Sequence, residues 1–173
     1  MPTTLPYLER KKDDLLESLQ GWPEEHLQFK PTGGGWSAAQ VVDHLVRTET
    51  EIVAAARAGL AQPHRIGVRD RAGTWFLQRV FQSNRKVKAP GSVEAIMPAD
   101  APSLADCTQR WQRTREELAV LKQNAERASG QGIFRHPVGG WMTVDGVLDF
   151  FAVHIHHHGF QTATLERAIK ECR

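Results

Sequence analysis

Apolar residues recur every three or four positions in four separate stretches of the chain, which is the spacing of an amphipathic α-helix. The first stretch covers residues 4–19 and ends before Gly21 and Pro23, both of which interrupt helices. The second follows Ser37, a good N-cap residue, with Gln40 placed three residues later to complete a capping box. This second helix is predicted to end near Gly59.

The third apolar stretch begins near Pro102 and ends at Gly130, and the fourth follows the N-cap candidate Thr143 and runs to about Lys170. Between the second and third stretches, glycines and prolines interrupt residues 61–101 repeatedly, and only the sequence TWFLQRVFQ indicates a short helix there. We therefore expect a long crossover that is functional or partly structured. No segment has the alternating pattern of an extended sheet.

Helices of this length cannot each bury an apolar stripe alone, so they must pack against one another. The predicted fold is all-α: a four-helix bundle with a long crossover between its second and third helices. With 173 residues, the chain is expected to form a single domain over residues 1–173.

Composition and charge exclude several classes of protein. There are 22 basic and 20 acidic residues, spread along the chain, so no basic patch for nucleic acid is indicated. Cys107 and Cys172 have no zinc-binding spacing, and Cys107 lies on an apolar stripe where it is expected to be a buried hydrophobe. The N-terminal residues MPTTLPYLERKKDD contain no apolar signal core, and no run approaches the roughly 18 apolar residues needed to cross a bilayer. We expect a cytoplasmic protein without nucleic-acid or membrane partners.

Four histidines lie within the sequence HIHHH of the fourth helix. At about 100° per residue, His158 falls roughly 40° from His154, and both continue the apolar stripe. His156 falls on the opposite side and is expected to be solvated. His157 lies at the border of the stripe, where partial exposure is expected.

An inward-facing i, i+4 histidine pair allows two imidazoles to converge on one transition-metal ion, although hydrogen-bonded core histidines are the commoner case. A buried imidazole needs a partner, so a third group or a polar network is required. His44 is the natural third ligand, yet it lies about 100° from the apolar stripe of its own helix, beside Gln40 and Thr48. Periodicity alone leaves both interpretations open.

The sequence GGGWSAAQVVDHLVRTE resembles the second-helix signature of the DinB superfamily, and HIHHHGFQ resembles its fourth-helix signature, His-x-x-x-His-x-x-Gln. The flanking sequences LQFKPTGGGWS and HPVGGWMTVDGVLDFF are similar to the family's approaches to these helices. The resemblance implies a DinB-like four-helix bundle with a divalent metal held by His44, His154 and His158. Zinc and nickel are the first candidates, followed by iron and copper.

Members of this family include thiol S-transferases that join thiols such as bacillithiol or mycothiol to electrophiles, as well as metal-dependent hydrolases. The resemblance therefore implies an enzyme whose open metal position takes a thiol, or water in the hydrolase alternative. A small-molecule thiol and an electrophile are the expected partners, and the resemblance to the family also suggests a homodimer. The alternative from another class is a non-enzymatic metal-binding or stress-related dimeric scaffold.

Three further residues are candidates for the surroundings of the metal. Gln161 falls one turn beyond His158 and can orient a ligand or make an interhelical hydrogen bond. His157 can carry a proton or contact a substrate, and Glu51 can act as a base or join a surface ion pair. His136, before Pro137, is expected to be a loop residue without a role. We assign no catalytic residue from the sequence.

Overall fold

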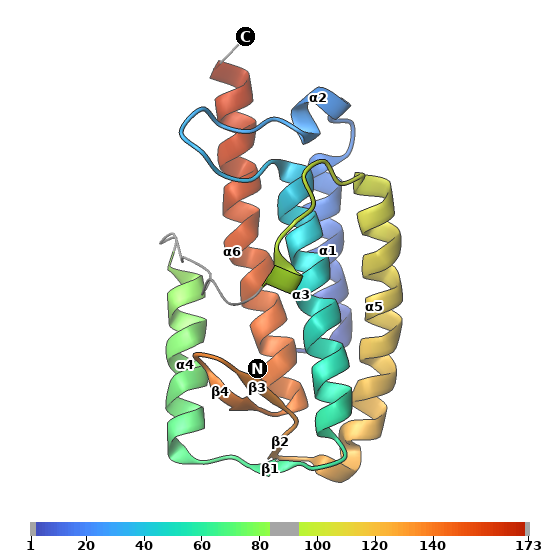
Figure 1. Cartoon of the computed structure of the whole chain (residues 1–173), viewed down its shortest axis with the longest axis vertical. Helices are drawn as coiled ribbons and strands as arrows, with labels where there is room; N and C mark the ends of the chain where they lie inside the picture. The colour runs from blue at the N-terminus through green and yellow to red at the C-terminus, as the bar shows by residue number, and fades with distance from the viewer. Residues whose placement is uncertain (1–2, 84–93, 172–173) are drawn as a thin grey trace.

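A computed structural model of the chain describes residues 3–83 and 94–171 (Figure 1). The described residues are mostly helical, which agrees with the predicted all-α class. Four long helices lie side by side, α1 (Leu5–Leu19), α3 (Ala38–Gly59), α5 (Leu104–Asn124) and α6 (Val144–Glu171). The shorter pieces are α2 (Glu24–Leu27), α4 (Val68–Gln82) and the 3-10 turns η1 (Glu94–Ile96) and η2 (Ala125–Ala128).

Side-chain caps set where the long helices begin. The Ser37 hydroxyl accepts a bond from the Gln40 backbone N–H at 3.2 Å, and the Gln40 side chain accepts one from the Ser37 N–H, so the predicted capping box is present. Thr143 caps α6 by accepting from the Gly146 N–H at 3.0 Å. The third helix begins two residues later than expected, because Ser103 supplies its cap.

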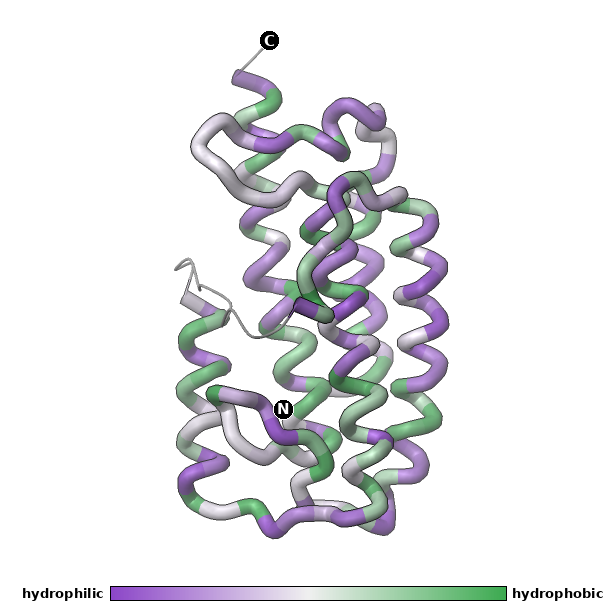
Figure 2. The backbone as a smooth tube through the Cα atoms, in the orientation of Figure 1, coloured by the Kyte–Doolittle hydropathy of each residue, from purple (hydrophilic) through white to green (hydrophobic). Residues whose placement is uncertain are grey.

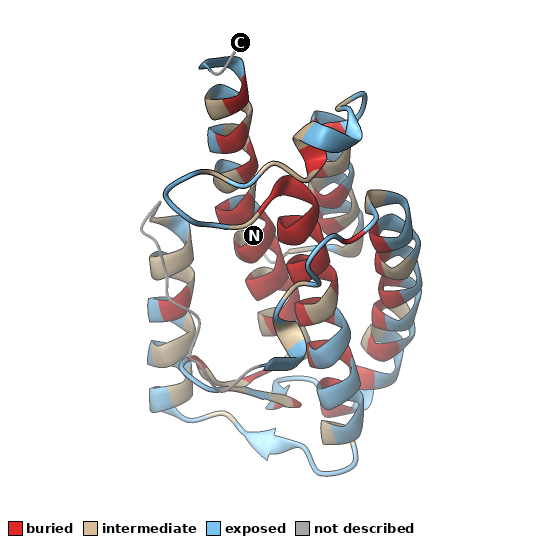
Figure 3. Cartoon of the chain, turned by 45° about the horizontal axis from the view of Figure 1, so that its top comes forward, coloured by how far each residue is buried: buried red, intermediate tan, exposed pale blue. Residues whose placement is uncertain are grey.

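The core lies where the four long helices face one another. Figure 3 shows buried residues concentrated on α3 and α6, and Figure 2 shows hydrophobic positions alternating with hydrophilic ones along the same helices. Each large apolar side chain that is fully buried contributes roughly 1.5–3 kcal/mol to folding. Trp111, Phe151, Leu45, Leu118 and Leu148 are among these.

Two small antiparallel sheets, which the sequence did not indicate, lie beside the helices (Figure 1). Strand β1 (His64–Arg65) pairs with β2 (Gln131–Gly132), and β3 (Phe134–His136) pairs with β4 (Gly140–Met142). Strands of two or three residues are too short to produce a detectable alternation of polar and apolar positions.

Helix α4 also begins earlier than the sequence indicated, at Val68 rather than near Thr74. Gly73 made this region appear broken, yet it lies inside the helix. A Cβ at Gly73 would lie 2.9 Å from the Gly139 carbonyl oxygen, so the glycine allows α4 to approach the β3–β4 turn closely. Pro90, Gly91 and Cys172 lie outside the described residues.

Among the described residues, none of the helices combines the length and apolar character required to cross a membrane.

Candidate metal centre

His44 is fixed by a backbone carbonyl from a distant part of the chain. It lies in the second turn of α3, and its Nδ1 is 2.8 Å from the carbonyl oxygen of Ile96 at the end of η1. A carbonyl can only accept, so Nδ1 carries the hydrogen and Nε2 keeps a lone pair. The ring is thereby oriented in the manner typical of metal-binding histidines.

His154 and His158 lie one turn apart on α6, and their Nε2 atoms are 3.0 Å apart. On the other side of its ring, His158 donates from Nδ1 to the side-chain oxygen of Gln161 at 3.0 Å. Gln161 therefore does for His158 what the Ile96 carbonyl does for His44: it leaves Nε2 as the free nitrogen.

The three histidines meet although they come from two helices. One ligand nitrogen from each of His44, His154 and His158 lies within 4.8 Å of the others, and each residue is at most 5% exposed. Imidazoles bound tetrahedrally at about 2.0–2.1 Å from zinc have nitrogens roughly 3.4 Å apart, so only small adjustments are needed. The structure thus brings together the three histidines that the family resemblance implies as ligands.

Burial keeps these imidazoles neutral. It lowers the pKa of His44 below its ordinary value of 6.5, although the bond to Ile96 acts in the opposite direction. Burial lowers the pKa of His158 to about 3 and that of His154 well below its ordinary range, and the neighbouring histidines add to both shifts. Near pH 7 all three rings therefore have a lone pair available for a metal.

Hydrogen bonds alone do not satisfy this group. One hydrogen can be shared between the Nε2 atoms of His154 and His158, which leaves Nδ1 of His154 as an acceptor. That Nδ1 is buried and has no partner among the described residues, and such an atom costs about 1–3 kcal/mol. A cation bound by one nitrogen of each ring would replace the shared hydrogen, and Nδ1 of His154 would then carry a hydrogen as a donor. The three neutral imidazoles would thereby share one partner for their lone pairs, so the residues fit a divalent transition metal.

Aromatic rings from three different segments surround the histidines. The Trp36 ring centroid lies 4.5 Å from that of His44, and the Phe150 ring stacks on His154 at 5.2 Å. Phe81, near the end of α4, lies 5.3 Å from His154. These apolar neighbours lower the local dielectric, which strengthens charge interactions at the site.

The other histidines of the run differ in their surroundings. His156 is exposed, as expected, and its ring lies against Phe160. His157 is buried rather than partly exposed, because α4 covers that side of α6 and places Phe81 5.2 Å from its ring. Burial lowers the pKa of His157, and the Phe81 carbonyl partly opposes this shift.

Glu51 lies apart from the histidine group. It is exposed on α3, seven residues from His44, which corresponds to about 10 Å along a helix axis. Asp43 is a buried carboxylate close to the site that the sequence analysis did not single out. Burial raises its pKa, but bonds from Arg110, Ala99 and Arg47 outweigh this effect, so the net pKa lies below 3.8.

Two features of the site had little or no signal in the sequence. The Ile96 carbonyl is a backbone atom, so residue type cannot identify it. Asp43 could have been noticed as a charged residue next to His44 in an otherwise apolar turn, but its partners Ala99 and Arg110 are 56 and 67 residues away.

A family model described as the DinB superfamily matches residues 7–161 of the chain. The matched residues include all three histidines and Gln161. Comparisons with curated proteins and with solved structures found no match. Because the family model covers most of the sequence, from the first long helix into the last, the chain belongs to the DinB superfamily.

Proposed function

We propose that this protein is a metal-dependent thiol S-transferase that joins a low-molecular-weight thiol to an electrophilic small molecule. In this proposal His44, His154 and His158 hold one divalent transition metal, with zinc and nickel as first candidates and iron and copper as further ones. The observation that carries the proposal is the meeting of three neutral imidazoles, whose ligand nitrogens all lie within 4.8 Å of one another.

Three protein ligands leave a coordination position open, as in catalytic rather than structural sites. When bound, a divalent metal supplies a Lewis acid that lowers the pKa of a thiol or a water at that position. The chain's own contribution is to keep the rings neutral by burial and to aim them through the Ile96 carbonyl and Gln161. Trp36, Phe81 and Phe150 limit the access of water.

The surroundings favour a thiol over water as the nucleophile. Hydrolysis usually needs a general base, often a carboxylate, to take a proton from water. Among the described residues, Asp43 is occupied by two arginines and a backbone N–H, and Glu51 lies about 10 Å away along α3. A thiol, with an ordinary pKa near 8.5, loses its proton far more readily than water, with a pKa near 15.7.

The transfer balances without a redox partner. A sulfur–carbon bond forms, the bond between that carbon and its leaving group breaks, and the thiol proton passes to solvent. With an alkyl halide as electrophile the leaving group is a halide ion, so no oxidant or reductant takes part.

The proposal also treats residues 1–173 as one DinB-like four-helix bundle, with the long crossover between α3 and α5, in a cytoplasmic protein. The packing of α1, α3, α5 and α6 around a shared core supports the bundle. The balance of 22 basic against 20 acidic residues supports a small-molecule role without nucleic-acid or membrane partners. Formation of a homodimer stays a prediction.

A thiol panel tests this function directly. Zinc-loaded and nickel-loaded protein is incubated with cysteine, glutathione, bacillithiol or mycothiol and with monochlorobimane, and the fluorescent conjugate is measured above the uncatalysed rate. We expect turnover with at least one thiol, its loss on chelation, and its recovery when metal is returned.

Two variants make the test specific. His44→Ala should abolish turnover while the far-ultraviolet circular dichroism stays that of the folded protein. His156→Ala changes an exposed histidine on the same helix as two of the ligands and should leave the rate unaltered. Chelator-sensitive hydrolysis of esters or amides without a thiol would instead indicate the hydrolase. Absence of turnover with every thiol and every hydrolysable substrate would indicate the scaffold.

A further inference from the structure

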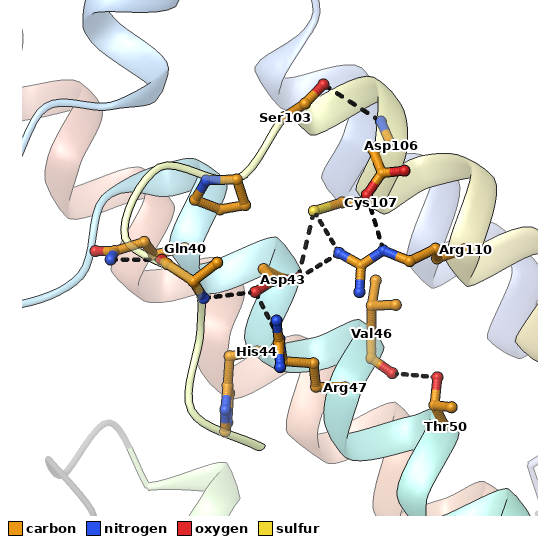
Figure 4. A network of polar contacts seen from close by, with 12 residues as sticks. Gln40, Asp43, His44, Val46, Arg47, Thr50, Ser103, Asp106, Cys107 and Arg110 are labelled. Carbon is orange, nitrogen blue, oxygen red and sulfur yellow. Dashed lines mark hydrogen bonds and ion pairs between the residues drawn. The ribbon is translucent and has the colours of Figure 1, made fainter. Parts of the chain in front are cut away.

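Asp43, the residue before His44, holds three different segments together. Its carboxylate is fully buried and accepts bonds from Arg110 of α5, from Arg47 Nε at 2.8 Å and from the backbone N–H of Ala99 at 2.8 Å (Figure 4). The Cys107 thiol also approaches it, at 3.7 Å. A buried carboxylate with two guanidinium partners and a backbone donor is a strong, charge-assisted arrangement.

The segment that Asp43 holds is the one that orients His44. The Ala99 N–H donates to Asp43, and the carbonyl of Ile96, three residues earlier in the same segment (residues 96–100), lies 2.8 Å from His44 Nδ1. Figure 4 shows Asp43 and His44 side by side on α3, next to this segment. Gln40 adds two bonds from its amide nitrogen, to the carbonyl oxygens of Ala99 at 2.9 Å and Asp100 at 3.2 Å.

Most of this segment is exposed to solvent. Ala99 and Asp100 are exposed and Ile96 is only half-buried, so burial alone does not determine where the Ile96 carbonyl lies. The polar bonds from Gln40 and Asp43 therefore do most to position it. In the two bonds with Gln40, carbonyl oxygens of the segment accept from a neutral amide. In the bond with Asp43, the Ala99 N–H of the segment donates to a charged carboxylate.

We propose that Asp43 is a positioning residue for the metal site: it fixes residues 96–100 against α3, so that the Ile96 carbonyl holds His44 in the form that presents Nε2. The expected effect of Asp43 on metal affinity rests on the proposed metal site. The orientation of His44, however, can be measured without a metal. It applies to one ligand only, because His158 is oriented separately by Gln161 on α6.

Two variants test whether Asp43 positions His44, one at each end of the hydrogen bond between Asp43 and the Ala99 N–H. Asp43→Asn keeps the size of the side chain but removes the charge that faces Arg47 and Arg110. Ala99→Pro removes the backbone N–H while leaving Asp43 and both arginines unchanged, and it lies at an exposed position. Trp111→Phe is the control: it removes the Trp111 bond to Glu49, in another buried polar cluster between α3 and α5.

The first readout is the tautomer of each histidine in metal-free protein, observed through imidazole 15N chemical shifts. We expect His44 to lose its fixed Nδ1–H form in Asp43→Asn and Ala99→Pro, and His158 to keep its own form. The second readout is zinc affinity, measured by competition with a chromophoric chelator. Loss of an outer partner of a metal ligand typically weakens binding about 10–100-fold, and we expect that range for both variants.

The control separates positioning from general stability. Trp111→Phe should lower the free energy of unfolding without changing the His44 tautomer or the zinc affinity. The inference is overturned if His44 keeps its tautomer in both test variants, or if their zinc affinity falls no further than that of Trp111→Phe. If Asp43→Asn does not fold, Ala99→Pro decides alone.

The metal site itself is contradicted separately if wild-type protein binds none of zinc, nickel, iron and copper. The tautomer measurement then still decides whether Asp43 positions His44. Neither readout depends on turnover, so a failure of the proposed transferase activity leaves this test unaffected.

Discussion

Gln161 accepts the Nδ1–H of His158 across 3.0 Å, from one turn further along the same helix. The amide oxygen thereby selects the tautomer whose Nε2 lone pair faces His44 and His154. We predict that Gln161→Leu weakens zinc binding by about 10–100-fold, because the ring loses its orienting acceptor. Chelator competition measures the change.

The conservative variant distinguishes orientation from packing. Gln161→Glu keeps an oxygen acceptor and should retain most of the zinc affinity. Thr164→Val, an exposed change on the same helix that removes only a local bond to the Phe160 carbonyl, should have no effect. Equal affinities for Gln161→Leu and wild type would contradict the assigned role.

His136 is not one of the three proposed ligands, and it provides a test of pH dependence. Its Nδ1 accepts the backbone N–H groups of Val138 and Gly139, at 3.1 and 3.0 Å, and burial lowers its pKa from 6.5 to about 4. Between these values the unfolded chain takes up a proton that the folded chain does not. Stability from this group is therefore complete above about pH 6.5 and falls as the pH drops toward 4, by at most about 1.4 kcal/mol per pH unit.

His136→Asn should remove this dependence while keeping the turn. The asparagine oxygen can accept the same two backbone bonds but does not titrate. Urea unfolding of both proteins at pH 7.5 and pH 5 measures the effect: wild type should lose more stability than the variant on acidification. Parallel losses would show that His136 is not the titrating group.

Glu49 and Arg115 form an ion pair inside the core, with Oε1 and Nη2 2.9 Å apart and both side chains almost fully buried. Burial raises the pKa of Glu49 to about 7, and Arg115 and Trp111 oppose that shift. Arg115→Met leaves the carboxylate without its charged partner and should cost about 3–5 kcal/mol of the free energy of unfolding.

The sign of the pH effect gives a second check on this pair. Without Arg115 the Glu49 pKa rises further, so the folded variant binds a proton that the unfolded chain releases above about pH 4.5. The destabilisation should therefore be larger at pH 8 than at pH 5.5. Adding Glu49→Leu to Arg115→Met should recover part of the lost stability, since no buried charge then remains. No recovery would mean that the cost comes from packing instead.

Much of the helical framework could be predicted because local chemistry sets it. Ser37, Gln40 and Thr143 cap helices through bonds to neighbouring residues, which spacing in the sequence reveals. The early part of α4 was missed because Gly73 is explained only by its contact with Gly139, a residue far along the chain. The strands were missed because they are too short to establish a period.

The histidine site, too, could be predicted only in part from the sequence. The inward direction of His154 and His158 follows from helical periodicity, and both are buried as that periodicity predicts. His44 lay on what looked like a polar edge of its helix, beside Gln40. That edge is buried because residues 96–100 cover it and bond to it, an arrangement that no local pattern contains.

The central claim is that His44, His154 and His158 bind one metal ion. The metal content of protein purified without a metal-affinity column tests this claim most directly. After incubation with zinc and removal of free ions, elemental analysis should find about one zinc per wild-type chain. His156→Ala should hold the same amount, and His44→Ala should hold almost none while staying folded. Wild-type protein without bound zinc, nickel, iron or copper, or His44→Ala with a full complement, would contradict the three-histidine site.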